Sequence, residues 1–368
     1  MDRCPRCDST RLVIESTERR TVVDIPEPLP YTAKEHVVNV YSCPNCGADG
    51  LVPESARDSL PSSTVAAIAE GEHRVEEGNM GVTLGRNILS SISTLWSVAR
   101  LPLRKISYLL ESMHAISLSP ATVWHALRKA SGSLDGFHEK VRKRVERSGR
   151  ANFDETGVPV AGRRGWIWVA ATKTVAFVQV AMSRRRDVLE RSFPGFRGVA
   201  VVDGWKSYRY FRIIQRCWAH VLREAEVLTL RARGKEEAEH LLSSLRSIFQ
   251  ETKRELEKHP PPNKSLHYVM LRRLRAVLSR EYTDPDVLKL VSKLMNASSD
   301  LFTFTLHAGV EPTNNHAERE LREPIVHRKI RGQLKCEDGM TVFSRLMTAV
   351  STWSLQGLNP LVEFKRYV

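Results

Sequence analysis

The stretch RANFDETGVPV, residues 150–160, decides how the chain is organised, because the spacing of apolar residues changes there. Before it, apolar residues recur every three to four positions, as in helices. From it onward, short runs rich in β-branched and aromatic residues are typical of strands. We therefore predict that a β-sheet begins near residue 150 and that a mainly helical region precedes it.

Further strands are predicted downstream of this stretch. The segments are a hairpin formed by residues 164–173 and 174–182 around Lys173–Thr174, a short helix at 185–193, and two later strands at 198–205 and 211–218. An antiparallel hairpin followed by strands that are reached through helices predicts an α/β fold with a mixed sheet.

The chain beyond this sheet is predicted to be helical. Residues 219–309 keep helical spacing almost throughout and are interrupted by KHPPPNKS at 258–265. Another helix is predicted to begin near Thr313, and MTVFSRLMTAVSTWSLQG at 340–357 predicts an amphipathic helix near the C-terminus.

Upstream of the sheet, two short predicted helices, LPLRKISYLLESM (101–113) and LSPATVWHALRKAS (118–131), are joined by a tight connection. Ser119 is a suitable N-cap and Pro120 a suitable first residue for the second helix. The pattern resembles a helix-turn-helix, although a generic helical bundle fits it equally well. A basic helix at 138–150 is either a solvated face or a contact to a phosphate backbone. The candidate DNA-binding residues on the outer side of the second helix are Thr122, His125, Arg128 and Lys129.

Four of the six cysteines form two CxxC pairs near the N-terminus: Cys4, Cys7, Cys43 and Cys46. Each pair turns sharply enough to aim two thiolates at one point, so the four predict one structural, tetrahedral Zn²⁺ site. The separation between the pairs exceeds the usual ~15–20 residues, so we expect a longer hairpin between them. Disulfides are the alternative, and a reducing compartment disfavours them.

The 368-residue chain carries 56 Lys and Arg against 42 Asp and Glu, a net charge of +14. Such a balance most often indicates a polyanionic partner, of which nucleic acid is the commonest, although solubility alone is the simpler explanation. No apolar run reaches the ~18 residues of a membrane span, and MDRCPRCDST lacks the apolar core of a secretory signal. We therefore expect a cytoplasmic protein without membrane association.

Three carboxylates are candidates for a metal site. Asp154 lies at or near the end of the first predicted strand, and Asp203 ends a later, buried one. Taken singly each is typical of a turn or a cap, but neighbouring parallel strands would place both side by side, where like charges repel unless a cation binds. Glu318 follows Asn315 by three residues, as in a capping box, yet a helix packed on the sheet could bring it to both aspartates. Three such acids would bind two Mg²⁺ ions.

Four motifs carry a family resemblance: DETG at 154–157, VVDGWKSY at 201–208, CWAHVLRE at 217–224 and TNNHAERELR at 313–322. Together with the cysteine pairs they resemble the DDE transposases of the RNase H-like fold, more specifically the insertion sequence sixty-six family. The resemblance implies that Asp154, Asp203 and Glu318 are a catalytic triad that holds two Mg²⁺ (or Mn²⁺) ions per active site. It also implies cleavage of DNA at the inverted repeats of a mobile element, joining of the 3′-hydroxyls to target DNA, and a homodimer or larger assembly on paired ends.

Further DNA contacts are predicted near these motifs, at Lys206, His220, Arg223, Asn315, Arg319 and Arg322. Cys217 and His220 could suggest a metal-binding pair, but no further Cys or His lies close in the sequence. Cys217 is therefore interpreted as a packing residue and His220 as a phosphate contact.

The expected domain organisation follows from these segments. Residues 1–50 bind zinc, 51–80 form a linker, 81–148 form the helix-turn-helix-like region, and 149–368 form the catalytic domain with a helical insertion at about 219–310. Two other functions stay open. One is a DNA-binding regulator without catalysis, which the presence of all three acids disfavours. The other is an RNase H-like nuclease that cuts without joining, which the N-terminal DNA-reading segments disfavour.

Overall fold

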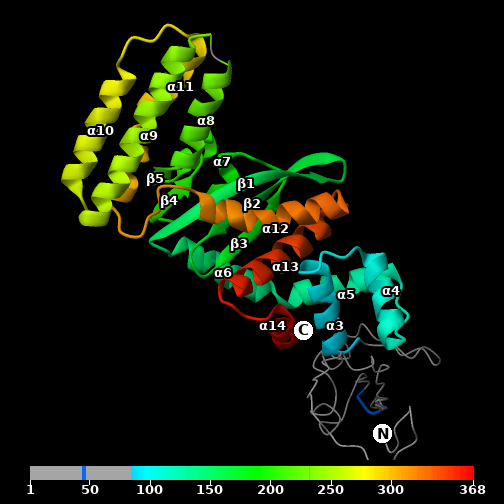
Figure 1. The fold of residues 1–368 in the computed structure, drawn as a ribbon. Coiled ribbons are helices and arrows are strands. Elements are labelled where there is room, and N and C mark those ends of the chain that lie inside the picture. The colour runs from blue at the N-terminus through cyan, green and yellow to red at the C-terminus, as the bar shows by residue number, and fades with distance from the viewer. Residues whose placement is uncertain (1–43, 47–83, 232) are drawn as a thin grey trace, which may run out of the picture.

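The structure, a computed structural model, describes residues 44–46, 84–231 and 233–368. A five-stranded sheet lies at the centre, a group of long helices projects from one end, and a second group of helices gathers at the other (Figure 1). The predicted zinc ligands Cys4, Cys7 and Cys43 lie outside the described residues, and Cys46 is exposed. Among the described helices, none is long and apolar enough to cross a membrane.

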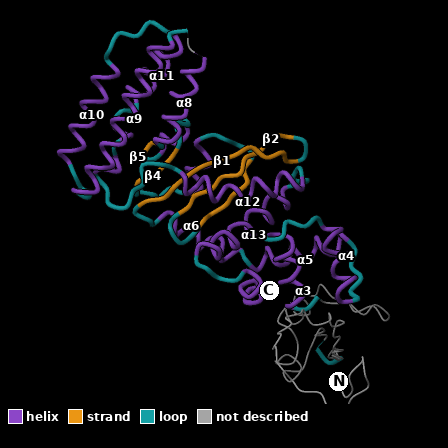
Figure 2. Tube along the Cα trace, in the orientation of Figure 1, coloured by secondary structure: helices purple, strands orange, loops and turns teal. Residues whose placement is uncertain are grey.

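The sheet is mixed, as the sequence predicts. Its strands are β1 (Arg150–Val160), β2 (Arg163–Ala171), β3 (Ala176–Ala181), β4 (Val199–Val202) and β5 (Ile213–Arg216). They lie in the order β3-β2-β1-β4-β5, with β1–β2 and β2–β3 antiparallel and β1–β4 and β4–β5 parallel (Figure 2). The turn between β1 and β2 places Ala161 and Gly162 at φ of 47° and 74°, the left-handed region that a two-residue hairpin turn requires.

The region before the sheet is helical. It contains α3 (Arg86–Ser97), α4 (Leu103–His114), α5 (Pro120–Ser133) and α6 (Asp135–Glu146). Ser119 is the N-cap of α5, since its Oγ accepts the backbone N–H of Thr122 at 3.0 Å. Apolar residues of α3, α4 and α5 share one hydrophobic core with α13, α14 and the sheet. This N-terminal helical group is therefore stabilised by packing against the end of the chain.

The helices that project from the sheet come after β5. They are α8 (Trp218–Arg231), α9 (Lys235–Lys258), α10 (Lys264–Leu278) and α11 (Pro285–Asn296). They enclose a hydrophobic core of their own, which includes Leu241, Leu245 and Leu294. Trp218 links this group to the sheet, because it packs in one core with Val199 and Val201 of β4. Its fully buried indole donates to the backbone oxygen of Leu301 at 2.6 Å, which also accepts Nε2 of Gln215 in β5. The predicted break at 258–265 falls between α9 and α10.

The two faces of the sheet are covered by different helices. The short α7 (Arg186–Ser192) and α6 pack on one face, and α12 (Asn315–Arg331) and α13 (Glu337–Leu355) pack on the other. On α13, Ser344, Thr348 and Thr352 are spaced four residues apart, and each hydroxyl accepts a backbone N–H of β3 at 2.9–3.2 Å. The helix thereby satisfies donors of an edge strand that would otherwise lack partners. A last helix, α14 (Pro360–Tyr367), was not predicted from the sequence.

Candidate active site

Asp154 and Asp203 are brought together by the parallel pairing of β1 with β4. Asn152 is paired with Val201, so Asp154, two residues further along β1, and Asp203, directly after β4, lie at the same end of this strand pair. One expectation is corrected here: Asp154 is the fifth residue of β1, and the strand continues to Val160 as one arm of the hairpin with β2. What ends before Asp154 is the pairing with β4, not the strand.

Glu318 reaches this place because the start of α12 is fastened to β1. The fully buried Asn314 donates from Nδ2 to the backbone oxygen of Phe153 at 2.8 Å, and its Oδ1 accepts Nδ2 of Asn152 at 3.1 Å. Asn314 is also the N-cap position of the helix, with no side-chain capping bond. The alternative role of Glu318 in a capping box with Asn315 is therefore excluded, since Asn315 is the first residue of the helix and Glu318 the fourth.

The acids at the sheet edge influence one another electrostatically. The pKa of Asp154 is raised from its ordinary 3.8 to about 7, first by burial and then by the negative charges of Glu155, Asp203 and Glu318. The hydrogen bond that Asp154 accepts from the backbone N–H of Glu155, at 2.9 Å, opposes this shift. Asp203 accepts the backbone N–H of Trp205 at 2.7 Å. The arrangement favours a bound cation, because a cation stabilises the ionised form of all three acids.

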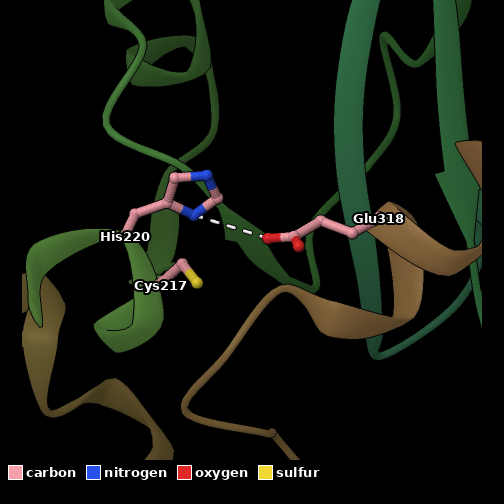
Figure 3. A group of neighbouring side chains, drawn as sticks. All are labelled: Cys217, His220 and Glu318. Carbon is pink, nitrogen blue, oxygen red and sulfur yellow. Dashed lines mark ion pairs between the residues drawn. The ribbon is translucent and has the colours of Figure 1, made fainter. Parts of the chain in front are cut away.

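A tighter group of ligand-type side chains surrounds Glu318. The donor atoms of Cys217, His220 and Glu318 all lie within 4.8 Å of one another (Figure 3). His220 Nδ1 is 3.5 Å from Glu318 Oε1. Within the described ranges this is the group that meets the spacing of a single metal ion, whereas the three acids are spread more widely. Sequence analysis did not interpret Cys217 and His220 as metal ligands, because no further Cys or His lies near them and Glu318 follows about a hundred residues later.

The residues assigned to DNA contacts fall into two places. Lys206, Arg223, Asn315, Arg319 and Arg322 are exposed on the short turn after β4, on α8 and on the first turns of α12. His220 is half-buried beside Glu318.

The second place is α5, which lies at the far end of the molecule from α8–α11 (Figure 1). His125, Arg128 and Lys129 are exposed there and Thr122 is half-buried. Arg128 pairs with Asp338 of α13 at 3.2 Å in an exposed salt bridge. The helix-turn-helix interpretation of α4 and α5 stays a prediction.

Glu155, a residue to which the sequence gave no role, lies on the opposite side of β1 from Asp154. Its side chain is 1% exposed and accepts the hydroxyl of Tyr208 and Nε of Arg184, the latter at 2.7 Å. The Arg184 guanidinium lies between two indoles, 4.6 Å from the Trp166 ring and 3.7 Å from the Trp205 ring. The DETG and VVDGWKSY motifs contain Glu155, Tyr208 and Trp205, but only the fold brings them into contact.

Comparison with known proteins identifies the family. The profile of the transposase IS66 family matches residues 81–342. Among solved structures, the Mos1 transposase paired-end complex with left transposon end is 12% identical, with 67% of this chain and 89% of that chain covered, at a TM-score of 0.13. No curated protein matches. The profile covers well over half of the 368 residues and includes all three candidate acids, so the chain belongs to the IS66 family of transposases.

Proposed function

We propose that this protein is a DNA transposase that cuts DNA strands and joins their 3′-hydroxyls to target DNA at a site formed by Asp154, Asp203 and Glu318. The observation that supports the proposal is that Asp203 and Glu318, from distant segments, lie near enough to Asp154 for their charges to add to the burial that raises its pKa to about 7. Membership of the family supports the same reaction.

The three carboxylates fit the metal that this chemistry needs. Carboxylate oxygens are the ligands that Mg²⁺ and Mn²⁺ prefer, and the acids repel one another without a cation. Asp154 lies within a strand and Asp203 directly after β4, so the backbone of both is held by the sheet. Glu318 lies on the helix whose start is fastened to β1 by two hydrogen bonds of the buried Asn314. A pair of bound Mg²⁺ or Mn²⁺ ions would activate the attacking oxygen and stabilise the leaving oxygen.

Basic side chains around the acids would hold the DNA. Arg319 and Arg322 lie exposed on the same helix as Glu318, and Arg223 lies exposed on α8 close behind His220. Guanidinium groups at these positions would neutralise phosphates that the acids alone would repel, and would orient the scissile strand. Lys206 and Asn315 extend this surface on either side.

A basic hollow near the start of β1 would continue the path of the DNA. It has a volume of about 320 Å³ and is lined by Arg144, Ser148, Gly149, Arg150, Thr172, Lys173 and Thr174. Arg144 comes from the basic helix α6 and Lys173 from the turn between β2 and β3. Three cations around one hollow suit a phosphate backbone. Together with α5 and a zinc-binding N-terminal segment, this surface would bind the ends of the element, paired by a dimer or larger assembly.

The test compares the wild type with Glu318→Gln on DNA that carries candidate element ends, with and without Mg²⁺ or Mn²⁺. The substitution keeps the size of the side chain and removes its charge. We expect metal-dependent cleavage and joining to fall at least about 1,000-fold while DNA binding is retained. Glu320→Gln, two residues further on the same helix, is the matched control and should keep its activity.

Each other outcome has a definite meaning. Equal activity of the wild type and Glu318→Gln would overturn the assignment of the triad. Metal-dependent cleavage without joining would identify a nuclease. Specific binding of the ends without any cleavage would identify a DNA-binding regulator.

A further inference from the structure

Cys217, His220 and Glu318 are brought together by two segments that run side by side. The backbone N–H of Trp218 donates to the oxygen of Pro312 at 3.0 Å. The backbone N–H of Asn314 donates to Sγ of Cys217 at 3.1 Å. These bonds fix the start of α8 against the start of α12, and the three side chains converge between them (Figure 3).

Two polar atoms of this group are buried in the described structure without a hydrogen-bond partner, although they face each other as a His–Glu ion pair (Figure 3). Within the part of the chain that the structure describes, neither His220 Nδ1 nor Glu318 Oε1 has a hydrogen-bond partner. Their separation of 3.5 Å exceeds the roughly 2.7–3.2 Å of a good N–H···O hydrogen bond. Buried polar atoms without partners are costly, so both atoms have bonding capacity for a ligand between them.

The chemistry of the three donors selects the kind of ligand. Cys217 and His220 are three residues apart at the start of a helix, so both project to the same side as α8 begins. A thiolate, an imidazole and a carboxylate are the ligand set of Zn²⁺ and of its spectroscopic substitutes Co²⁺ and Cd²⁺, whereas Mg²⁺ prefers oxygen ligands alone. Donor atoms within 4.8 Å of one another need only small side-chain movements to surround one ion.

We propose that Cys217, His220 and Glu318 form a second cation site, selective for one thiophilic divalent ion of the zinc type. Because Glu318 cannot serve both sites fully, an ion held there draws its carboxylate away from Asp154 and Asp203. Zinc would then inhibit the reaction that Mg²⁺ supports. This regulatory consequence rests on the proposed function, whereas the binding of the ion does not.

The binding test uses the metal-free, full-length chain titrated with Co²⁺, whose bonds to thiolates give a near-ultraviolet absorption band. The N-terminal CxxC pairs are present in every variant, so the result is the difference between variants. We expect Cys217→Ser and His220→Asn to bind one equivalent of Co²⁺ fewer than the wild type. Cys217→Ser should also lose part of the thiolate band. Cys336→Ser, which alters an exposed free cysteine, is the matched control and should behave as the wild type.

A folding defect would not obscure this result. Cys217 is fully buried, so its variant is checked by circular dichroism, while the His220 side chain is 36% exposed and tolerates replacement more readily. If the correctly folded His220→Asn and Cys217→Ser variants bind as much Co²⁺ as the wild type, with the same spectrum, the site does not exist.

The regulatory test adds Zn²⁺ to the Mg²⁺-dependent reaction. We expect micromolar Zn²⁺ to reduce wild-type activity at least about tenfold, and Cys217→Ser to resist it. Equal inhibition of both proteins would overturn the regulatory half of the proposal. The two proposals fail separately. If the variants bind one Co²⁺ equivalent fewer than the wild type but the wild type never cuts DNA, the cation site stands and the proposed function is refuted. If the wild type cuts DNA but the variants bind as much Co²⁺ as the wild type, the function stands and the cation site is refuted.

Discussion

Asp154 and Glu155 are neighbours in β1, and the alternation of the strand sends their side chains to opposite faces of the sheet. Asp154 faces α12 and meets two other acids, whereas Glu155 faces the hydroxyl of Tyr208 and the guanidinium of Arg184. Burial is the first cause that raises the pKa of both. For Glu155 the charge of Asp203 adds to that rise, but the hydrogen bonds from Tyr208 and Arg184 and the charge of Arg184 oppose it. For Asp154 the charges of Glu155, Asp203 and Glu318 all add to the rise, and one backbone hydrogen bond opposes it.

The difference separates a structural carboxylate from one that is available to a cation. Glu155 already has donors, so its burial stabilises the packing of the turn after β4 on the sheet. Asp154 has one backbone donor and three negative neighbours, so its burial costs free energy until a cation or a proton compensates it. Three of the four predictions below test this contrast, and one applies the same effect of burial to a histidine.

The largest expected effect is on activity. Asp154→Asn and Asp203→Asn should each reduce metal-dependent DNA cleavage at least about 1,000-fold, because each removes a metal-binding charge. Glu155→Gln should stay within about tenfold of the wild type, since Glu155 contacts Tyr208 and Arg184 instead. Cleavage rates of the three variants at saturating Mg²⁺ measure this difference. Equal losses of activity in all three would show that Glu155 is as important for cleavage as the two aspartates.

The second effect is an increase in stability. In metal-free protein at pH 8, Asp154→Asn should raise the free energy of unfolding by up to about 4 kcal/mol. The reason is that the rise of the Asp154 pKa from 3.8 to about 7 means that the ionised carboxylate destabilises the folded state, and asparagine carries no charge. Urea unfolding in the presence of a chelator measures it. Glu155→Gln is the comparison and should lower stability. A stability loss in Asp154→Asn would show that the acid is already compensated in the metal-free protein.

The third effect applies the same rule of burial to a base. Burial, the positive charge of Arg331 and that of Arg100 lower the pKa of His327 from 6.5 to about 4, against a hydrogen bond to the backbone oxygen of Ser97. Between pH 6.5 and 4 His327 is protonated in the unfolded chain but stays neutral in the folded one. Stability therefore falls as the pH falls through this range, by up to about 3 kcal/mol.

The His327 prediction is measured by unfolding at a series of pH values. His327→Gln keeps a donor for the Ser97 oxygen and has no charge to gain, so its stability should vary less across this window. The prediction is refuted if the wild type and the variant lose stability in parallel between pH 6.5 and 4.

The smallest effect concerns the donor that Glu155 has and Asp154 lacks. Tyr208→Phe removes the hydroxyl that donates to the buried carboxylate, so it should cost about 1–3 kcal/mol of stability. Tyr268→Phe is the matched control, because that side chain is 68% exposed and its loss of a hydroxyl should be almost neutral. Equal stability of both variants would mean that Glu155 gains nothing from Tyr208.

Much of the fold was predictable because it depends on local patterns. The spacing of apolar residues predicts the strands, the mixed sheet, the helices between 219 and 296 and the helix near Thr313, each of which is present. Ser119 was predictable as an N-cap because capping depends on residues within one turn. The short α14 escaped prediction, although Asn359 caps it and Pro360 begins it.

The site itself was only partly predictable. The sequence by itself determined that Asp203 follows a buried strand and that Glu318 lies near a helix start, since both depend on neighbours in the chain. Only the tertiary structure decided that Asn314 fastens that helix to β1. It also decided that Glu155 accepts hydrogen bonds from Tyr208 and Arg184, and that Cys217 and His220 lie beside Glu318. The physical reason is that periodicity and capping report contacts within a few residues, whereas these contacts join segments about 30 to 160 residues apart through sheet register and helix packing.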